Sequence, residues 1–324
     1  MMYPLKFNDI FKSVIWGGDK IGRFKGITLT QESVGESWEI SDVKGNVSVV
    51  KNGADAGMSL DDLIRRDGTQ LLGKHVAERF GSTFPLLIKF IDARDNLSIQ
   101  VHPNDLLAQE RHNSRGKTEM WYIIDAEPGA GLYSGFSQQI TPDEYVRRVA
   151  DDTITDVLAF HPVKKGDVFF LPAGRIHAIG KGIFIAEIQQ TSDITYRIYD
   201  YNRVGADGKP RQLHTDLAKD AIDYKLYDDL KTTYTPALNQ AVELVSCPYF
   251  TTSVLRIENS VTRPVAAHDS FSVYICMEGA ATLTDSNGNT LELHRGETCL
   301  IPAATTEVTL TPHDSALLLE SYIA

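Results

Sequence analysis

Residues 166–177 read GDVFFLPAGRIH, and residues 296–307 read GETCLIPAATTE. In both segments a glycine is followed, after five residues, by a proline, and a small residue comes two positions later. The first segment ends on His177 and the second on Glu307. A spacing that occurs twice indicates two copies of one structural unit, of which the second lacks the histidine.

Strand signals surround these two segments along most of the chain. Short runs rich in β-branched and aromatic residues alternate with Gly, Pro, Asn and Asp, a pattern typical of antiparallel sandwiches and barrels. We therefore predict a mainly β protein. The runs that carry this prediction are residues 47–50, 97–101, 120–124, 167–171, 183–189 and 272–277.

Helical spacing of apolar residues appears in three segments, over 59–80 with a break near Gly68, over 141–158 and over 216–224. The second opens with Thr141 and Pro142, which favour a helix start. We expect a first domain over residues 1–230 that contains the segments at about 59–80 and 141–158, and a second domain over residues 240–324. The polar, proline-containing stretch 228–239 is the expected connection.

Composition restricts the possible partners. The 324 residues are 42% hydrophobic and 23% charged, as in ordinary globular proteins. A formal net charge of -11 argues against nucleic-acid binding, which requires clustered cations. No signal-peptide pattern and no apolar run of about 18 residues occurs, so we expect no membrane partner. Three scattered cysteines are expected to be reduced thiols of a cytoplasmic protein. The oligomeric state is not predicted.

A possible metal site follows from strand alternation. In residues 96–103, NLSIQVHP, Gln100 and His102 lie on one strand face, and in residues 117–124, KTEMWYII, Lys117 and Glu119 do. His177 ends the first repeated segment. Each of these residues alone has an ordinary explanation as a surface or core residue. Together, two imidazoles, a carboxylate and an amide oxygen suit Zn²⁺ with an open position for substrate.

Five segments also resemble one known family. They are SWEISD (37–42), IQVHPND (99–105), GKTEMWYI (116–123), LPAGRIHAIG (171–180) and AEIQQTSDITYRIYDYNR (186–203). In order and content they resemble the type I phosphomannose isomerases of the cupin superfamily, in their short bacterial form. The resemblance implies two cupin-like (jelly-roll) antiparallel β-barrels with a small helical region, the second barrel being non-catalytic. It also implies one zinc ion per chain, with the ligands Gln100, His102, Glu119 and His177.

The same resemblance implies an aldose-ketose isomerase that interconverts mannose 6-phosphate and fructose 6-phosphate by enediol-type proton transfer. Such a reaction requires a base, stabilisation of a developing negative oxygen, and cations for the phosphate. By resemblance, Arg197 is an active-site residue, Lys117 lies in the substrate pocket and Glu187 matches an acidic active-site position. We expect Glu187 to take part in acid-base chemistry, although a solvated strand carboxylate is an equal alternative. Lys89 and Arg203 are further phosphate candidates.

Three other functions are considered. An iron- or manganese-dependent cupin oxygenase would usually present a His-x-His pair, but here Gln100 takes the first position. A catalytically inactive sugar-phosphate-binding cupin would keep the fold without turnover. A relative acting on a different sugar phosphate is also compatible with these residues, and the residue that removes the proton is left open.

Overall fold

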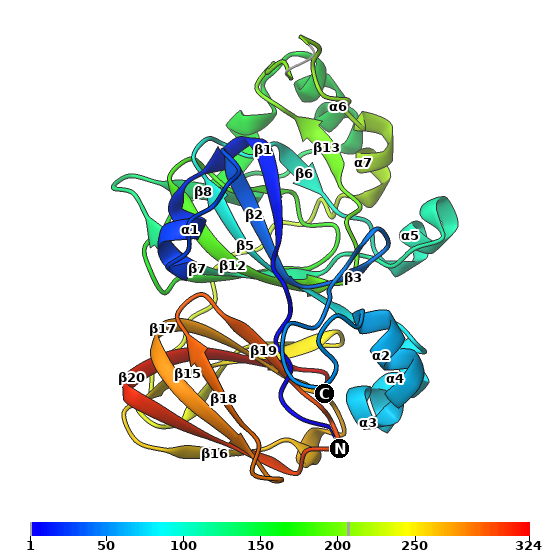
Figure 1. Ribbon diagram of the computed structural model, residues 1–324. Helices are drawn as coiled ribbons and strands as arrows, with labels where there is room; N and C mark the ends of the chain where they lie inside the picture. The colour runs from blue at the N-terminus through cyan, green and yellow to red at the C-terminus, as the bar shows by residue number, and fades with distance from the viewer. Residues whose placement is uncertain (1, 206–207) are drawn as a thin grey trace.

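The structure, a computed structural model, describes residues 2–205 and 208–324. Two β-rich units lie against each other (Figure 1), and we call them the first unit, with the strands up to residue 199, and the second unit, with the strands from residue 241 onward. Nearly all pairings between their strands are antiparallel. The predicted mainly β fold is therefore confirmed.

The first unit contains two larger sheets that face each other, as far as the described residues show. The six-stranded sheet has the order β1 (Ile10–Gly18), β2 (Val34–Ile40), β5 (Leu86–Ala93), β12 (Ile183–Gln190), β7 (Glu119–Ala126) and β10 (Val168–Leu171). The five-stranded sheet has the order β13 (Tyr196–Tyr199), β6 (Ile99–Val101), β11 (His177–Ala178), β8 (Gly131–Phe136) and β9 (Leu158–Pro162). The two sheets do not hydrogen-bond into a closed barrel, but their arrangement is cupin-like. A small pair, β3 (Asp42–Val43) and β4 (Asn46–Val47), lies beside them.

The second unit is built on one sheet. Its main path runs through β14 (Ala241–Cys247), β15 (Phe250–Ile257), β20 (Glu307–Tyr322), β17 (Ser272–Asp285) and β18 (Thr290–His294). The strand β16 (Val261–Pro264) pairs with β20, and β19 (Thr298–Ile301) pairs with β17. The long strands β17 and β20 bend, with register shifts after Cys276 and Gly279, and so enclose the core of this unit.

The sequence repeat is also a structural repeat. In the first unit β10 pairs with β7, and in the second β19 pairs with β17 in the same way. Each strand is followed by a turn closed by one hydrogen bond, from Arg175 N to Pro172 O and from Thr305 N to Pro302 O, both at 3.0 Å. Gly166, with φ of 86°, begins the first copy in a conformation that favours glycine. The repeated segment therefore has the same local structure in both units.

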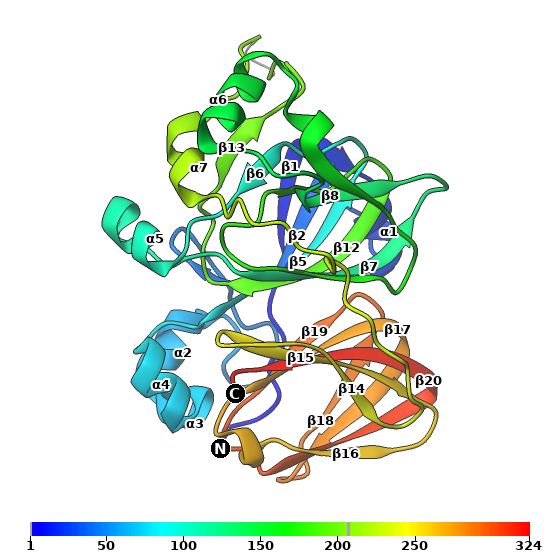
Figure 2. The same ribbon diagram turned by 180° about the vertical axis from the view of Figure 1, so that it is seen from behind.

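The helices largely follow the sequence prediction. The segment 59–80 forms α2 (Leu60–Asp67), α3 (Thr69–Leu72) and α4 (Lys74–Phe80), which are separated at Gly68 and Gly73. The segment 141–158 forms α6 (Pro142–Ala150) and the 3-10 turn η1 (Ile154–Val157), while Leu158 is already in β9. The third segment forms α7 (Thr215–Ala221). Seen from behind (Figure 2), α6 and α7 lie at the far end of the first unit, and α2 to α4 lie beside the second.

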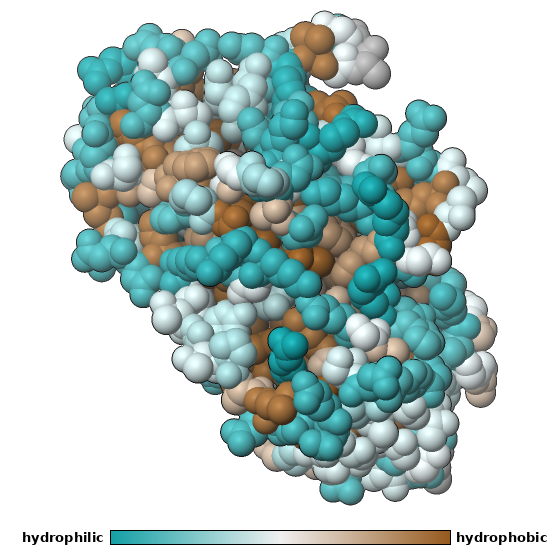
Figure 3. Space-filling view, turned by 90° about the vertical axis from the view of Figure 1, so that its left-hand side faces the viewer, coloured by the Kyte–Doolittle hydropathy of each residue, from teal (hydrophilic) through white to brown (hydrophobic). Residues whose placement is uncertain are grey.

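Three short helical elements lie outside the predicted segments. They are α1 (Lys20–Lys25), α5 (Asp105–His112) and the 3-10 turn η2 (Ala266–His268). Among the described residues no helix is long and apolar enough to cross a membrane. On the face drawn in Figure 3, hydrophobic residues mostly form small areas among hydrophilic ones.

The two units share a hydrophobic core. In β7, Met120, Tyr122 and Ile124 point to one face of the sheet and pack in a cluster that includes Val273 and Leu319 of the second unit. Glu119, Trp121 and Ile123 alternate with them and point to the interior of the first unit. The six-stranded sheet therefore has its back against the second unit and its front towards the candidate site.

The ends of the described chain are also tied together. Leu5 and Leu300 exchange two backbone hydrogen bonds, of 2.9 Å and 2.8 Å. The stretch 228–239 runs between the units, with Thr232 N bonded to Val168 O at 2.9 Å and Asn239 N bonded to Arg256 O at 2.7 Å.

Candidate metal centre

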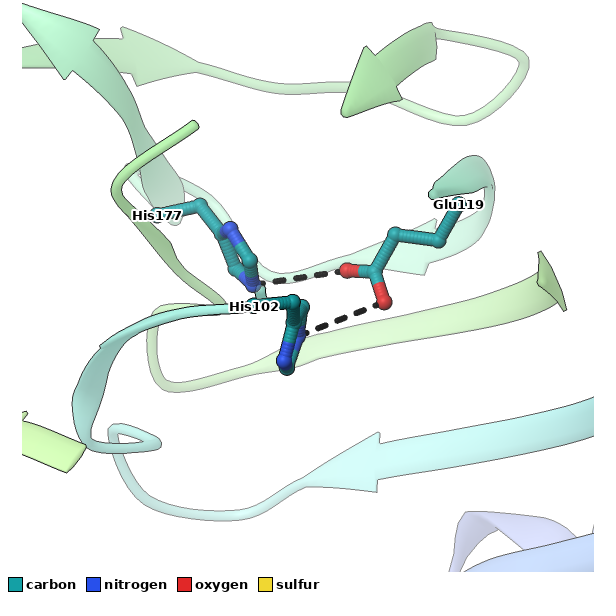
Figure 4. A group of neighbouring side chains, drawn as sticks. All are labelled: His102, Glu119 and His177. Atoms are coloured by element: carbon teal, nitrogen blue, oxygen red, sulfur yellow. Dashed lines mark ion pairs between the residues drawn. The ribbon is translucent and has the colours of Figure 1, made fainter. Parts of the chain in front are cut away.

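The two sheets of the first unit bring three predicted ligands together. Glu119 is the first residue of β7, His177 is the first residue of β11, and His102 directly follows β6. One ligand atom of each lies within 4.8 Å of the others. Figure 4 shows one carboxylate oxygen of Glu119 facing each imidazole. All three side chains are buried, with Glu119 at 0% exposure.

The hydrogen bonds of the two histidines determine which nitrogens are available. Nδ1 of His102 lies 2.8 Å from Ile194 O, and Nδ1 of His177 lies 2.8 Å from Arg175 O. A carbonyl oxygen only accepts, so each Nδ1 donates its hydrogen and each Nε2 keeps a lone pair. These nitrogens lie 3.5 Å and 3.4 Å from the oxygens of Glu119.

At the centre of this group Nε2 of His177 faces Oε1 of Glu119, and both atoms are acceptors. Nε2 of His102 and Oε2 of Glu119 instead share the ammonium of Lys117 as a donor. Oε1 of Glu119 is buried and has no hydrogen-bond partner among the described residues. Buried polar atoms are rarely left without a partner in native proteins, and a cation would satisfy all three groups at once. The donor set thus fits a metal ion.

Gln100, the fourth predicted ligand, lies beside this group. Its backbone is opposite that of His177 between β6 and β11, and its amide Nε2 is 3.3 Å from Nε2 of His177. A half-turn of the amide group would present its oxygen at the same place. All four residues are therefore close together, while their roles as ligands remain a prediction.

Burial controls the charges of the ligand residues. Burial, followed by the charge of Lys117, lowers the pKa of His177 to about 3 and holds the pKa of His102 well below its usual value. Both imidazoles are consequently neutral near pH 7, the form that binds metals. Burial, together with the charge of Glu187, raises the pKa of Glu119 to about 8. A bound cation would favour the ionised carboxylate instead.

Lys117 and Glu187 form an ionic group next to the histidines. The Lys117 ammonium pairs with Glu119, lies 3.0 Å from His102 Nε2 and lies 3.8 Å from Glu187 Oε1. Glu187 also accepts a hydrogen bond of 3.1 Å from Trp121 and lies 3.7 Å from Lys89 Nζ. Glu187 is only 3% exposed, so the alternative of a solvated carboxylate is wrong.

The lysines keep Glu187 charged despite its burial. Burial alone would raise the pKa of Glu187, but the charges of Lys117 and Lys89 outweigh it and hold this pKa at about 2. Glu187 is therefore ionised near pH 7, and an ionised carboxylate can accept a proton, although its low pKa makes it a weak base.

A cavity of about 210 Å³ adjoins this ionic group. Gln100, Lys117 and Glu187 line it, and Arg197 of β13 lies opposite Gln100 in the neighbouring strand. Nη1 of Arg197 donates to Gln212 O at 2.9 Å, whereas its buried Nε has no partner in the described part of the chain. The cavity thus combines a carboxylate with cations, as an anionic substrate requires.

The chain resembles known proteins in two stretches of its sequence and over most of its length. A family model described as phosphomannose isomerase type I, catalytic domain, matches residues 5–126, and one described as mannose-6-phosphate isomerase, cupin domain, matches residues 240–318. A mannose-6-phosphate isomerase of Streptococcus mutans is 39% identical over 266 residues, which are 81% of each chain. The chain belongs to the type I phosphomannose isomerase family.

Similarity to two Bacillus subtilis proteins also supports membership of the phosphomannose isomerase family. A probable mannose-6-phosphate isomerase of Bacillus subtilis, GmuF, is 34% identical over 96% of both chains. The crystal structure of a mannose 6-phosphate isomerase from the same organism superposes with a TM-score of 0.88 and 30% identity, and the match covers 99% of both chains. A putative mannosephosphate isomerase from Archaeoglobus fulgidus, with a TM-score of 0.81 and 22% identity, supports the fold alone.

Other residues of this phosphomannose isomerase site were not predicted. They are Glu36, Asp193 and Arg211, which line the cavity. Glu36 lies on the same face of β2 as Trp38, which also lines the cavity, so strand alternation could have identified Glu36. Arg211 lies outside any helix or strand and follows no periodic pattern. Of the two weaker phosphate candidates, Lys89 lines the cavity. Arg203 is absent from its lining and pairs with Asp200 at 2.6 Å.

Proposed function

We propose that the chain is a metal-dependent mannose-6-phosphate isomerase, which interconverts mannose 6-phosphate and fructose 6-phosphate. Family membership supports the reaction. The observation that carries the metal dependence is the close group of His102, Glu119 and His177, in which the lone pair of His177 Nε2 faces the buried Oε1 of Glu119, an oxygen without a donor among the described residues.

Zinc is the metal that we propose, one ion per chain, held by these three residues and Gln100. Two neutral imidazoles, one carboxylate and one amide oxygen form a set of nitrogen and oxygen donors that Zn²⁺ accepts in catalytic sites. When bound, the ion supplies a Lewis acid that polarises substrate oxygens. Burial keeps both histidines unprotonated, the form in which an imidazole binds a metal ion.

Glu187, Lys117 and Arg197 have the other roles that the isomerisation requires. Glu187 exchanges the proton between C1 and C2, since it is ionised and lines the cavity. Lys117 stabilises negative charge that develops on the substrate, because its ammonium lies between Glu119 and Glu187. Arg197 binds the anionic substrate, because its guanidinium group lines the cavity and its Nε has no partner among the described residues.

The alternatives are less well supported. A cupin oxygenase has no support in the comparisons, which return isomerases. An inactive binding protein would have no need for an ionised, buried Glu187 beside the metal site.

A cytoplasmic location completes the proposal. A sugar-phosphate substrate and three cysteines without disulfides, two of them buried, support it. Subcellular fractionation with antibody detection is the direct check, and recovery of the protein outside the cytoplasm would contradict it.

The decisive experiment is a coupled assay on mannose 6-phosphate. The purified protein is assayed as prepared, after treatment with a chelator, and after addition of Zn²⁺. We expect fructose 6-phosphate to form, formation to stop with the chelator, and activity to return with zinc. Turnover that survives complete metal removal would refute the metal dependence. A zinc-loaded protein without turnover would favour the inactive binding protein.

A further inference from the structure

The turn that precedes His177 contacts all three segments that carry the candidate ligands. Gly174 N donates to His102 O at 2.9 Å, and Ala173 N donates to the hydroxyl of Thr118 at 3.2 Å. Arg175 O accepts the hydrogen bond from His177 Nδ1 at 2.8 Å. The backbone of one turn therefore sets the relative positions of the three segments, and only the contact with Thr118 depends on a side chain outside the site.

Thr118 is also held by a second residue. It lies between Lys117 and Glu119, and its side chain alternates with theirs to the other face. Its backbone N–H donates to Gln190 Oε1 at 2.8 Å, and its carbonyl accepts from Gln190 N at 3.1 Å. Thr118 and Gln190 are each 4% exposed. These bonds fix the backbone next to Glu119 and therefore the direction in which the Glu119 side chain points.

The support extends to the second unit. Gln190 Nε2 donates to Asp105 Oδ1 at 3.1 Å, and this oxygen also accepts from Gly116 N at 2.8 Å. The hydroxyl of Tyr249, in the turn between β14 and β15, donates to Asp105 Oδ2 at 2.6 Å. A continuous series of hydrogen bonds thus runs from the second unit to both sides of Lys117.

The repeated turn of the second unit provides an internal comparison. There Ala303 N and Ala304 N, at the positions of Ala173 and Gly174, donate to the backbone carbonyls of Leu71 and Gln70 in α3. Strand register places Phe271 at the position of Thr118, because Ser272 pairs with Ile301 as Glu119 pairs with Leu171. The hydroxyl at this position therefore occurs only in the unit with the candidate metal centre.

We propose that Thr118 and Gln190 are positioning residues for the metal centre, and that Asp105 and Tyr249 extend their support to the second unit. This inference rests on the proposed function. Neither Thr118 nor Gln190 lines the 210 Å³ cavity, so both act through Glu119 and Lys117. Removing a group that orients a metal ligand typically costs about 10- to 100-fold in metal affinity or activity.

The test compares Thr118→Val with Thr118→Ser, which keeps the hydroxyl. We expect Thr118→Val to weaken Zn²⁺ binding about tenfold, measured by competition with a chromophoric chelator, and to lower kcat by a similar factor. Thr118→Ser should restore both values to within about twofold of the unmodified protein. Gln190→Leu should lower zinc affinity and kcat by about the same factors as Thr118→Val.

Thr252→Val is the matched control. Thr252 is a buried threonine of the second unit whose hydroxyl bonds to Ser321 at 2.8 Å, far from the metal centre in sequence and sheet. This variant loses a comparable hydrogen bond, so its thermal stability falls, but its zinc affinity and kcat should not change. Thr118→Val with zinc affinity and kcat within about twofold of the unmodified protein would overturn the proposal.

Tyr249→Phe keeps the proposal testable if Thr118→Val does not fold. It removes one hydrogen bond at the outer end of the series, and we expect zinc affinity to fall about two- to fivefold. Unchanged affinity in this variant would overturn the part assigned to the second unit. Because zinc binding is measured without substrate, an unmodified protein that binds zinc but does not turn over refutes only the proposed reaction.

Discussion

At the level of single residues, the candidate site contains buried side chains of opposite charge that lie close to one another. Lys117 contacts Glu119, His102 and Glu187, so one ammonium serves two carboxylates and an imidazole. Glu187 has Lys89 as a second cation, whereas Oε1 of Glu119 has no donor. The two carboxylates are therefore unlike: Glu187 is ionised by the protein itself, and Glu119 requires a metal ion for the same result.

Substitution of single residues should separate metal binding from catalysis. We expect His102→Ala and Glu119→Ala to lose both zinc and activity, because each removes a ligand from a buried set. Arg197→Ala should keep its zinc and lose activity, since Arg197 lines the cavity and is not one of the proposed zinc ligands. Metal analysis beside the coupled assay measures both. Full zinc content in His102→Ala and Glu119→Ala would refute the ligand assignment.

Asp200 offers a test of pH dependence away from the metal. It is buried and accepts hydrogen bonds from Arg211 at 2.7 Å and Arg203 at 2.6 Å. Burial would raise the pKa of Asp200, but these guanidinium groups outweigh it and lower that pKa. Its contribution to stability is therefore present above the unfolded value, near pH 4, and is lost as the pH falls through the folded value.

The corresponding variant is Asp200→Asn. We expect its free energy of unfolding at pH 7 to be about 1–2 kcal/mol lower than that of the unmodified protein. Urea unfolding at pH 7 and at pH 3 measures the difference, which should shrink at the lower pH as the carboxylate is protonated. A difference that stays the same at both values would contradict the assignment.

The sequence predicted the residues that lie on strands better than those on loops. Gln100, His102, Glu119 and Glu187 follow strand alternation or a motif, and all lie at the site. Arg211 could not be found in this way, because its position depends on a loop whose course is set by the ion pair with Asp200. Local periodicity contains no information on such contacts between distant backbone segments.

At the level of elements, helix prediction depended on burial. The segments that form α2 and α6 bury an apolar side and were predicted, with side-chain caps from Ser59 and Thr141. The helix α5 buries only Ala108, so it has no apolar periodicity to detect, although Asn104 caps it. An exposed helix of this kind is specified by its cap and its turns, signals that are weaker than an amphipathic pattern.

One glycine lies where the helices meet the second unit most closely. Gly73, between α3 and α4, has φ of 94°, and a Cβ at this position would lie 2.0 Å from Asp269 O. Gly57 has a similar φ of 91° with open space around it. The two positions separate backbone strain from steric overlap.

We therefore expect Gly73→Ala to destabilise the protein more than Gly57→Ala does. Backbone strain alone costs about 1–3 kcal/mol in either variant. Overlap with the Asp269 carbonyl adds to it in Gly73→Ala, because backbone cannot move away as a flexible side chain can. Urea unfolding of both variants measures the difference. Equal destabilisation would show that α3 and α4 can move away from Asp269 without a measurable loss of stability.

At the level of the whole molecule, one hydrophobic cluster contains residues of both units. The rings of Phe84 and Phe271, from different units, lie 4.5 Å apart between centroids. The cluster around them extends from Leu5 to Ile323. Sequence repeats predicted two units correctly, but nothing in the repeats indicated that the six-stranded sheet is buried against the second unit.

Because the core is shared, we expect the units to unfold together. All three tryptophans, Trp16, Trp38 and Trp121, lie in the first unit, so their fluorescence reports on that unit alone. Phe271→Ala, in the second unit, should cost about 3–5 kcal/mol and shift the fluorescence transition together with the circular dichroism transition. A fluorescence midpoint that does not move would mean that the units unfold independently.

The pairing of Leu5 with Leu300 has a consequence for how this protein is made. Leu5 leaves the ribosome long before its partner has been translated, and at about 5–20 residues per second the delay is roughly 15–60 s. Throughout this time the backbone N–H and C=O of Leu5 lack the partner that they will have in the folded protein. The segment around Leu5 therefore reaches its final place only after Leu300 has been synthesised, and until then it is available to chaperones.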